Sequence, residues 1–561
     1  MRHSYALNCL FIAAISVAMA HLSPESGAAR FDLAPPEGDR RERLFEWSPL
    51  VRDIQKFLTE FSLLPAPADG RISPELQQSI RAYQRQHGLV EDGEASGSLL
   101  RHMESTGRPD ALKQRLAEAR RIQTARARAA LLANPETRDL LQAPAPVRAS
   151  PQDLSAEACL QSPSPQCLID EALLATAGIE RSDYRDWALR EIVQAQALRG
   201  SLADVRSSIR HIGDVRLVVV SLREAAIALV TSGHMEDARV LAANIPDDGN
   251  RARALAAITI AEANPDDAGT TTQPATLPAL RDLLSHLEDP VAAGEIAAEV
   301  AGKLDQSGRS EAAAAMLTLA RGFVDPGASR DTRQTVLGIL AGAYARIGRT
   351  EEALAILAAL GDIGRDHIAL AETAGQIALG QLPKEALALA DKLRSPRLHV
   401  LALSKIAAAR LQQGDREHAT RILKRAMTTS LDIVRPFAAD TALAEIAEVW
   451  AGIQDYTQAF SVIDKIRSRT LRAQTIWRFA ASNGGDADGL RDRAVEATEA
   501  VNSAFDRASI LVGAAILMAE NGRPDDARAV FAMALRDARA VRSEWWRARI
   551  FSRLANALIR L

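Results

Sequence analysis

A turn signal that recurs through most of the chain constrains its fold more than any other feature. Stretches such as "SGRSEAAA", "IGRTEEAL" and "QGDREHAT" each join two apolar segments rich in helix-favouring residues. The clearest turn residues stand 40, 32, 34 and 40 residues apart, at Gly308, Gly348, Gly380, Gly414 and Gln454. Periods of this size are typical of helical hairpins that stack into a solenoid. The sequence therefore predicts an all-α array over residues 166–561.

Each repeat contains the residues that a tight helical hairpin needs. A glycine at the turn can adopt the left-handed backbone conformation that ends a helix. Five residues later an alanine recurs, and its small side chain would let the two helices approach closely. These alanines are Ala238, Ala313, Ala353, Ala419 and Ala527. Since one hairpin cannot bury its apolar face alone, we expect consecutive hairpins to stack.

One repeat resembles the tetratricopeptide family. In "LAGAYARIGRTEEALAIL", Tyr344, Gly348, Ala353 and Leu354 fall where that family's pattern places such residues. The other repeats lack the family's Trp and its closing proline. The resemblance implies a tetratricopeptide-like α-solenoid whose concave face recognises a peptide or a domain of a protein partner.

A different pattern occupies residues 46–104. Two Asp-Gly pairs, Asp69-Gly70 and Asp92-Gly93, each predict a tight turn, because glycine tolerates positive φ and aspartate can bond the backbone beyond it. Apolar residues at helical spacing surround these turns. They are Val51, Ile54 and Leu58, then Ile72, Leu76, Ile80 and Tyr83, then Leu99, Leu100 and Met103. We therefore expect a small module of three helices around one core.

This layout resembles the peptidoglycan-binding domain family, a three-helix module found on cell-wall hydrolases and other envelope proteins. The family's pattern is matched by Val51, Gln55, Asp69-Gly70, Ile80, Tyr83, Gln84, Gly88-Leu89 and Asp92-Gly93. Ser73 and Ser96 stand where the family usually has Gly, and Leu76 and Leu99 stand where it usually has Thr. The resemblance implies that this module binds peptidoglycan.

Peptidoglycan presents hydroxyls, amides and carboxylates, so its recognition needs hydrogen-bonding side chains with at least one base. The candidate contact residues are Arg71, Tyr83, Gln84, Arg85 and His87. Two alternatives stay open, in which Tyr83 belongs to the core and Gln84 caps or braces a turn. Asp69 and Asp92 are interpreted as structural.

The N-terminal residues indicate export. Residues 1–20 combine Arg2, an apolar stretch and the small-x-small sequence that ends at Ala20, which together are typical of a cleaved signal peptide. Residues 21–45 are polar and are interpreted as a tether, so we expect a periplasmic or secreted envelope protein. In such an oxidising compartment, the two remaining cysteines are expected to form a disulfide. They are Cys159 and Cys167.

Two connecting segments follow the module. Residues 109–134 predict a basic linker helix with a net charge of +4 from six basic and two acidic residues. Contact of this helix with an anionic membrane is an alternative that we favour less than packing against a neighbouring helix. Residues 135–165 contain six prolines and are interpreted as a semi-rigid linker. The pair Trp545-Trp546 either anchors a partner or packs the end of the array.

The remaining composition argues against several functions. With 68 Lys and Arg against 71 Asp and Glu, the charge gives no reason to expect nucleic acid as a partner. The histidines are scattered without metal-ligand spacing, so we expect no metal and no cofactor, and we find no catalytic constellation. The sequence favours a non-enzymatic envelope protein that binds peptidoglycan and presents a scaffold to protein partners. A regulator that recruits a peptidoglycan hydrolase and a cryptic cell-wall hydrolase are the alternatives.

Overall fold

The computed structural model describes most of the chain after the predicted tether, namely residues 48–60, 63–64, 67–105, 109–141, 156–263, 273–324, 330–360, 368–482 and 489–561. The predicted signal peptide and tether lie outside the described residues. The described part is all-α, as predicted, with helices joined by turns and no strand. None of its helices is long and apolar enough to cross a membrane.

Three short helices form the N-terminal module: α3 (Pro49–Glu60), α4 (Pro74–Gln86) and α5 (Gly97–Ser105). The Ser73 hydroxyl accepts a hydrogen bond from the Leu76 amide and so caps the start of α4, and Ser96 caps α5 in the same way through Leu99. The separate core of this module is built from Val51, Ile54, Leu58, Leu64, Leu76, Ile80, Tyr83, Leu99 and Met103. All but Leu64 were predicted from helical spacing.

A long helix, α6 (Pro109–Ala133), follows the module, as the sequence predicts. Its middle is exposed on nearly every side, and Ile122 is 48% exposed rather than packed against a neighbour. The start of the predicted Pro-rich linker folds as α7 (Pro135–Arg138) and a 3₁₀ turn, η2 (Asp139–Leu141). These two elements are folded because the Asn134 side chain caps the start of α7 and because Leu140 is buried in a hydrophobic core formed with later helices. Its end also folds, as α8 (Ala156–Gln161), while residues 142–155 lie outside the described residues.

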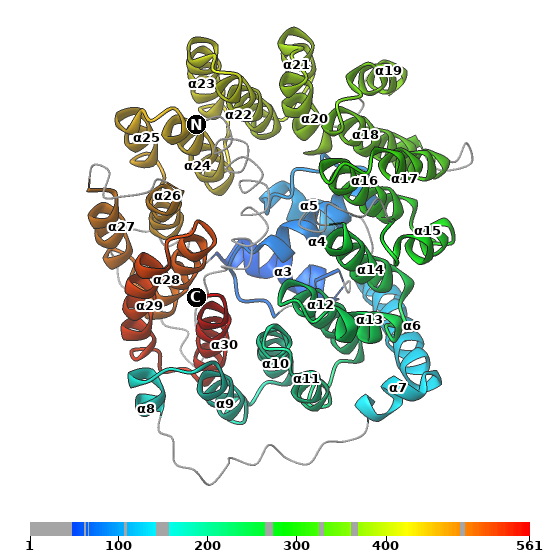
Figure 1. The fold of residues 1–561 in the computed structure, drawn as a ribbon, viewed down its shortest axis with the longest axis vertical. Coiled ribbons are helices and arrows are strands. Elements are labelled where there is room, and N and C mark those ends of the chain that lie inside the picture. Colours follow the sequence, from blue (N-terminus) through cyan, green and yellow to red (C-terminus); the bar gives the residue numbers. More distant parts are fainter. Residues whose placement is uncertain are drawn as a thin grey trace.

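The rest of the chain forms two concentric circles of helices (Figure 1). The inner circle consists of α10 (Ser182–Leu198), α12 (Val215–Thr231), α14 (Asp248–Glu262), α16 (Pro290–Gln306), α18 (Arg330–Arg346), α20 (Ile368–Leu379), α22 (Pro396–Gln412), α24 (Pro436–Gly452), α26 (Arg469–Ser482), α28 (Ala504–Glu520) and α30 (Glu544–Arg560). The outer circle consists of α9 (Pro165–Thr176), α11 (Leu202–Ile209), α13 (Met235–Ala243), α15 (Leu277–Ser285), α17 (Ser310–Gly322), α19 (Thr350–Leu360), α21 (Pro383–Ala390), α23 (Arg416–Ser430), α25 (Tyr456–Ile463), α27 (Leu490–Glu499) and α29 (Pro524–Ala538). Each inner helix packs against the next, which gives the stacked hairpins that the repeat pattern predicts.

The hairpin turns follow the predicted pattern with one shift. Gly308, Gly348 and Gly414 have positive φ, and Gln454 adopts the same conformation at φ 64°. Between α20 and α21, however, the left-handed residue is Gln381, also at φ 64°, and not Gly380. A Cβ on Gly380 would lie 2.6 Å from the Thr350 hydroxyl oxygen, so this glycine is needed for close approach and not for its backbone conformation.

The recurring alanines are all buried in the helical array. Each of the five predicted positions is fully buried: Ala238, Ala313, Ala353, Ala419 and Ala527. A larger side chain at such a site would have to displace the facing helix, because helical interiors are close-packed. The burial of all five alanines is consistent with the predicted tight hairpins.

The solenoid closes on itself, which the repeat pattern did not predict. The last helix, α30, packs against both α9 and α10 and so joins the end of the array to its beginning. Trp545 lies edge-on to Tyr184 of α10, and Trp546 packs on Phe505 of α28. Both tryptophans are 5% exposed, which confirms the packing interpretation of this pair.

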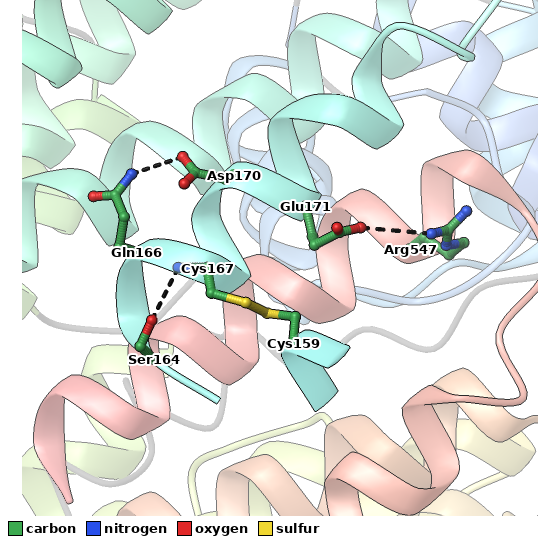
Figure 2. The surroundings of a disulfide bond; sticks show 7 residues. All are labelled: Cys159, Ser164, Gln166, Cys167, Asp170, Glu171 and Arg547. Carbon is green, nitrogen blue, oxygen red and sulfur yellow. Dashed lines mark hydrogen bonds and ion pairs between the residues drawn. A yellow bond between two sulfur atoms is a disulfide. The ribbon is translucent and has the colours of Figure 1, made fainter. Parts of the chain in front are cut away.

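A disulfide lies beside this closure (Figure 2). Cys159 of α8 is bonded to Cys167 of α9, as predicted. Glu171 of α9 pairs with Arg547 of α30 at 3.8 Å, as Figure 2 shows, and Glu157 of α8 pairs with Arg539 at the end of α29 at 3.4 Å. The disulfide therefore holds together the two helices that receive the C-terminal end of the chain.

Candidate functional site

The module of α3, α4 and α5 lies inside the ring of helices (Figure 1). The module contacts α16, α22 and α28, and the residue that caps the start of α24. The concave side of the solenoid, which the sequence assigned to a protein partner, thus receives the module of the same chain.

Each Asp-Gly turn of the module is braced by a glutamine from the preceding helix. The Gln84 side chain donates to Asp92 Oδ1 at 2.6 Å and accepts from the Gly93 amide at 2.9 Å. Gln55 does the same for the first turn, donating to Asp69 Oδ1 and accepting from the Gly70 amide, each at 2.6 Å. Both glutamines are buried, so the bracing interpretation of Gln84 matches its position.

The carboxylate of the first turn is strongly desolvated. Burial raises the pKa of Asp69 to about 6, against the hydrogen bonds from the Arg71 amide and the Gln55 side chain, which lower it. Because these two donors hold the carboxylate in place, Asp69 has the structural role that its sequence context indicates.

Tyr83 lies in the core of the module, and aromatic rings cover it on two sides. Its ring stacks on His87 at a centroid distance of 4.2 Å, and its hydroxyl lies 3.3 Å from His102 Nδ1. Burial and the neighbouring His102 lower the pKa of His87. Tyr83 has no exposed surface, while His87 remains partly exposed.

Arg71 points out of the first turn into the wall of the ring. Its Nη1 donates to Asp506 Oδ2 of α28 at 3.0 Å, and the side chains of Arg71 and Asp506 are 5% and 1% exposed. Burial raises the pKa of Asp506, although the positive charge of Arg71 opposes this. The Arg71 guanidinium is therefore engaged by a carboxylate of the ring.

Two arginines of the ring hold the second turn. Arg435, the residue that caps α24, donates to Asp92 Oδ2 at 3.1 Å and also to Glu94 Oε2. Arg397 of α22 donates to the backbone oxygen of Asp92. The acidic second turn of the module and this basic patch of the ring are complementary in charge.

Arg85 lies at the end of α4, next to the second turn. Its guanidinium pairs with Glu91 at 3.1 Å within the module and with Glu295 of α16 at 3.6 Å. The side chains of Arg85 and Glu295 are 29% and 44% exposed. Their ion pair therefore contributes little to stability compared with the buried pair of Arg71 and Asp506. Arg85 thus retains some access to solvent.

A cavity of about 780 Å³ lies between the module and the ring. The module contributes Leu50, Val51 and Ile72, the residues from Ala95 to Ser98, and Arg101. The ring contributes Arg435, Pro436 and Phe437 at the start of α24 and Arg467 in the loop before α26. This volume is in the range of ligand-binding clefts.

The predicted contact residues thus do not share one exposed surface. Arg71, Tyr83 and Gln84 are buried, and Arg85 and His87 are partly exposed. Their proposed contacts with peptidoglycan remain predictions. The sequence reasoning missed Arg101, Arg435 and Arg467, because the cavity that they line exists only when the ring has closed around the module.

The described residues hold no group of three or more His, Cys, Asp or Glu side chains that could bind a metal ion. Three carboxylates at the contact between module and ring accept hydrogen bonds from side chains of the protein, namely Asp69 from Gln55, Asp92 from Arg435 and Asp506 from Arg71.

Comparison with protein families identifies the class of the module. Residues 48–103 match the family described as "Putative peptidoglycan binding domain". The chain therefore contains a domain of this family, within the predicted boundaries 46–104. Its match to that family points to peptidoglycan as the ligand and fits a location in the cell envelope.

The other comparisons add little. None of the curated proteins matches the chain. Among solved structures, the crystal structure of Ton1535 from Thermococcus onnurineus NA1 is similar over 60% of this chain and 99% of that chain, at 16% identity and a TM-score of 0.28. A TM-score this low carries no argument about fold or function.

Proposed function

We propose that this chain is an exported, non-enzymatic envelope protein that binds peptidoglycan through the module of residues 48–103. The family match of that module carries the proposal. Its separate core and its two braced turns support it, because they give the module the fold that the family resemblance implies. The disulfide between Cys159 and Cys167 is in keeping with an oxidising compartment outside the cytoplasm.

In this proposal the ring fixes the orientation of the module. The buried pair of Arg71 with Asp506 and the contacts of Arg435 with Asp92 and Glu94 hold two of its loops. A module held in this way would present one defined surface to the wall, and it would lose little conformational entropy on binding. A protein partner of the scaffold would then meet the outer helices, because the module occupies the concave side.

Sedimentation with insoluble peptidoglycan tests the proposal. The mature chain from residue 21 onward should pellet with purified peptidoglycan in a saturable manner and remain in the supernatant without it. Added soluble muropeptides should compete. A chain that stays in the supernatant at all peptidoglycan concentrations would refute wall binding.

A second assay separates binding from hydrolysis. Peptidoglycan labelled with a covalent dye should release no soluble dye when incubated with the mature chain. Dye release that grows with time and with protein concentration would instead establish the cryptic hydrolase that the sequence left as an alternative.

A further inference from the structure

We propose that the cavity between the module and the start of α24 binds a carboxylate-bearing peptide of the wall, with Arg101 of the module and Arg467 of the ring as its anion-binding residues. This inference rests on the proposed function and specifies which chemical group of peptidoglycan is recognised. It also makes the ring a direct part of the binding site.

The side chains that line the cavity carry positive charge. Its described lining contains three arginines, Arg101, Arg435 and Arg467, and no carboxylate. Arg435 is already neutralised by Asp92 and Glu94. The cavity therefore has a net positive lining that favours an anionic ligand.

The guanidinium groups of Arg101 and Arg467 are open to a ligand. Both Arg101 and Arg467 are exposed, and within the described part of the chain neither guanidinium makes a hydrogen bond or an ion pair. The nearby carboxylate of Asp440 is occupied, because it accepts from the backbone amides of Arg467 and Ser468 at 3.1 and 2.9 Å. Both guanidiniums are therefore available to a ligand carboxylate, for which arginine offers paired donors.

The rest of the cavity lining combines apolar side chains with polar groups. The lining also includes the apolar side chains of Leu50, Val51 and Ile72 from the module and of Phe437 from the ring, and Ser98 adds a hydroxyl. Such a site suits a ligand with an anionic end, short alkyl groups and amides to bond. Wall peptides have all three, whereas the sugar strand alone offers mainly hydroxyls.

The position of the cavity also explains why the ring must hold the module. Arg101 belongs to α5 and Arg467 to the loop between α25 and α26, so the two guanidiniums face one cavity only in the docked arrangement. The contacts of Arg435 with Asp92, Glu94 and Ser98 fix that arrangement at the edge of the cavity.

Binding of a soluble muropeptide to the mature chain, measured by isothermal titration calorimetry, tests the inference. The probe is a disaccharide tetrapeptide, once with free carboxylates and once with its carboxylates amidated. Arg101→Ala and Arg467→Ala should each weaken binding of the free acid by about tenfold, the effect of losing one hydrogen bond to a charged group. The amidated probe should bind wild type as weakly as the free acid binds the variants.

Arg542→Ala is the matched control. Arg542 is also an exposed arginine in a loop that precedes an inner helix, but it does not line the cavity. This variant should bind like wild type. Circular dichroism and thermal unfolding of all three variants should match wild type, because the side chains replaced make no hydrogen bond or ion pair with the described part of the chain.

The outcomes separate this inference from the proposed function. If wild type and both variants bind the free acid and sediment with peptidoglycan equally, the cavity is not the site, although wall binding stands. Equal binding of the amidated probe would overturn the carboxylate assignment. If wild type neither binds the probe nor sediments, the proposed function and this inference fall together.

Discussion

Breaking the ion pair between the module and the ring should cost far more than replacing both of its members. Arg71 and Asp506 are 5% and 1% exposed and meet through one hydrogen bond of 3.0 Å. Asp506→Ala leaves the guanidinium of Arg71 buried without its carboxylate, and Arg71→Met leaves the carboxylate buried without its cation. Each substitution should therefore lower the free energy of unfolding by about 3 to 5 kcal/mol.

The double variant should be much less destabilised than the sum of the two. Desolvation opposes the pair in the native protein, as the raised pKa of Asp506 shows, and the buried Arg71 Nε has no hydrogen-bond partner among the described residues. Removing both charges abolishes these costs together with the attraction, so the double variant should lie within about 1 to 2 kcal/mol of wild type.

Urea unfolding of the mature chain gives all four free energies of this double-mutant cycle. Coincident transitions by circular dichroism and by tryptophan fluorescence would justify a two-state treatment. From these figures we expect a coupling energy of at least about 4 kcal/mol. Additive effects, or single variants as stable as wild type, would refute the reasoning and show that the module is not docked against α28 in solution.

Three further predictions concern stability. Gln84→Ala removes both bonds that brace the second turn and should lower the unfolding free energy by about 1 to 3 kcal/mol in urea titrations; an unchanged midpoint would contradict the brace. Gly380→Ala places a Cβ 2.6 Å from the Thr350 hydroxyl oxygen and should lower the melting temperature. The double variant Gly380→Ala with Thr350→Ala should recover part of that loss. Because the pKa of Asp69 is raised from 3.8 to about 6 in the folded protein, its charge costs stability above pH 6, at most about 3 kcal/mol, and costs nothing below pH 3.8. The wild type should therefore gain stability relative to Asp69→Asn as the pH falls from 7 to 4, and a constant difference between the two would be inconsistent with the raised pKa.

The local features of the fold could be predicted because short-range chemistry determines them. Helical spacing identified the core of the module, from Ile54 to Met103, and the turn pattern identified Gln454 as a left-handed residue in place of glycine. The pattern failed at Gly380, because glycine serves both for positive φ and for close approach, and sequence alone does not distinguish these uses. Here Thr350 of the preceding hairpin decides it.

The closure of the ring and the docking of the module could not be predicted from the sequence. Arg71 and Asp506 are 435 residues apart, and their pairing depends on the summed curvature of every hairpin between them. No single repeat encodes that curvature. For the same reason the residues that line the cavity from the ring side, Arg435 and Arg467, carried no signal of a binding role.

The candidate contact residues show a similar limit. Tyr83 and Gln84 were named because they can form hydrogen bonds with a ligand, yet in the structure both are buried and Gln84 bonds Asp92 within the module. Arg71 was named for its charge, which the ring carboxylate of Asp506 engages. Residue type alone thus could not tell an intramolecular partner from a ligand.

Hydrogen exchange of the mature chain, with and without a soluble muropeptide, tests the central claim most directly. If the wall peptide binds to the docked module, exchange should slow both in residues 95–101 of the module and in residues 435–439 and 467–471 of the ring. Exchange around Asp506 should stay unchanged. Slower exchange in the module alone, with faster exchange around Asp506, would mean that the module leaves the ring to bind, and it would contradict this account.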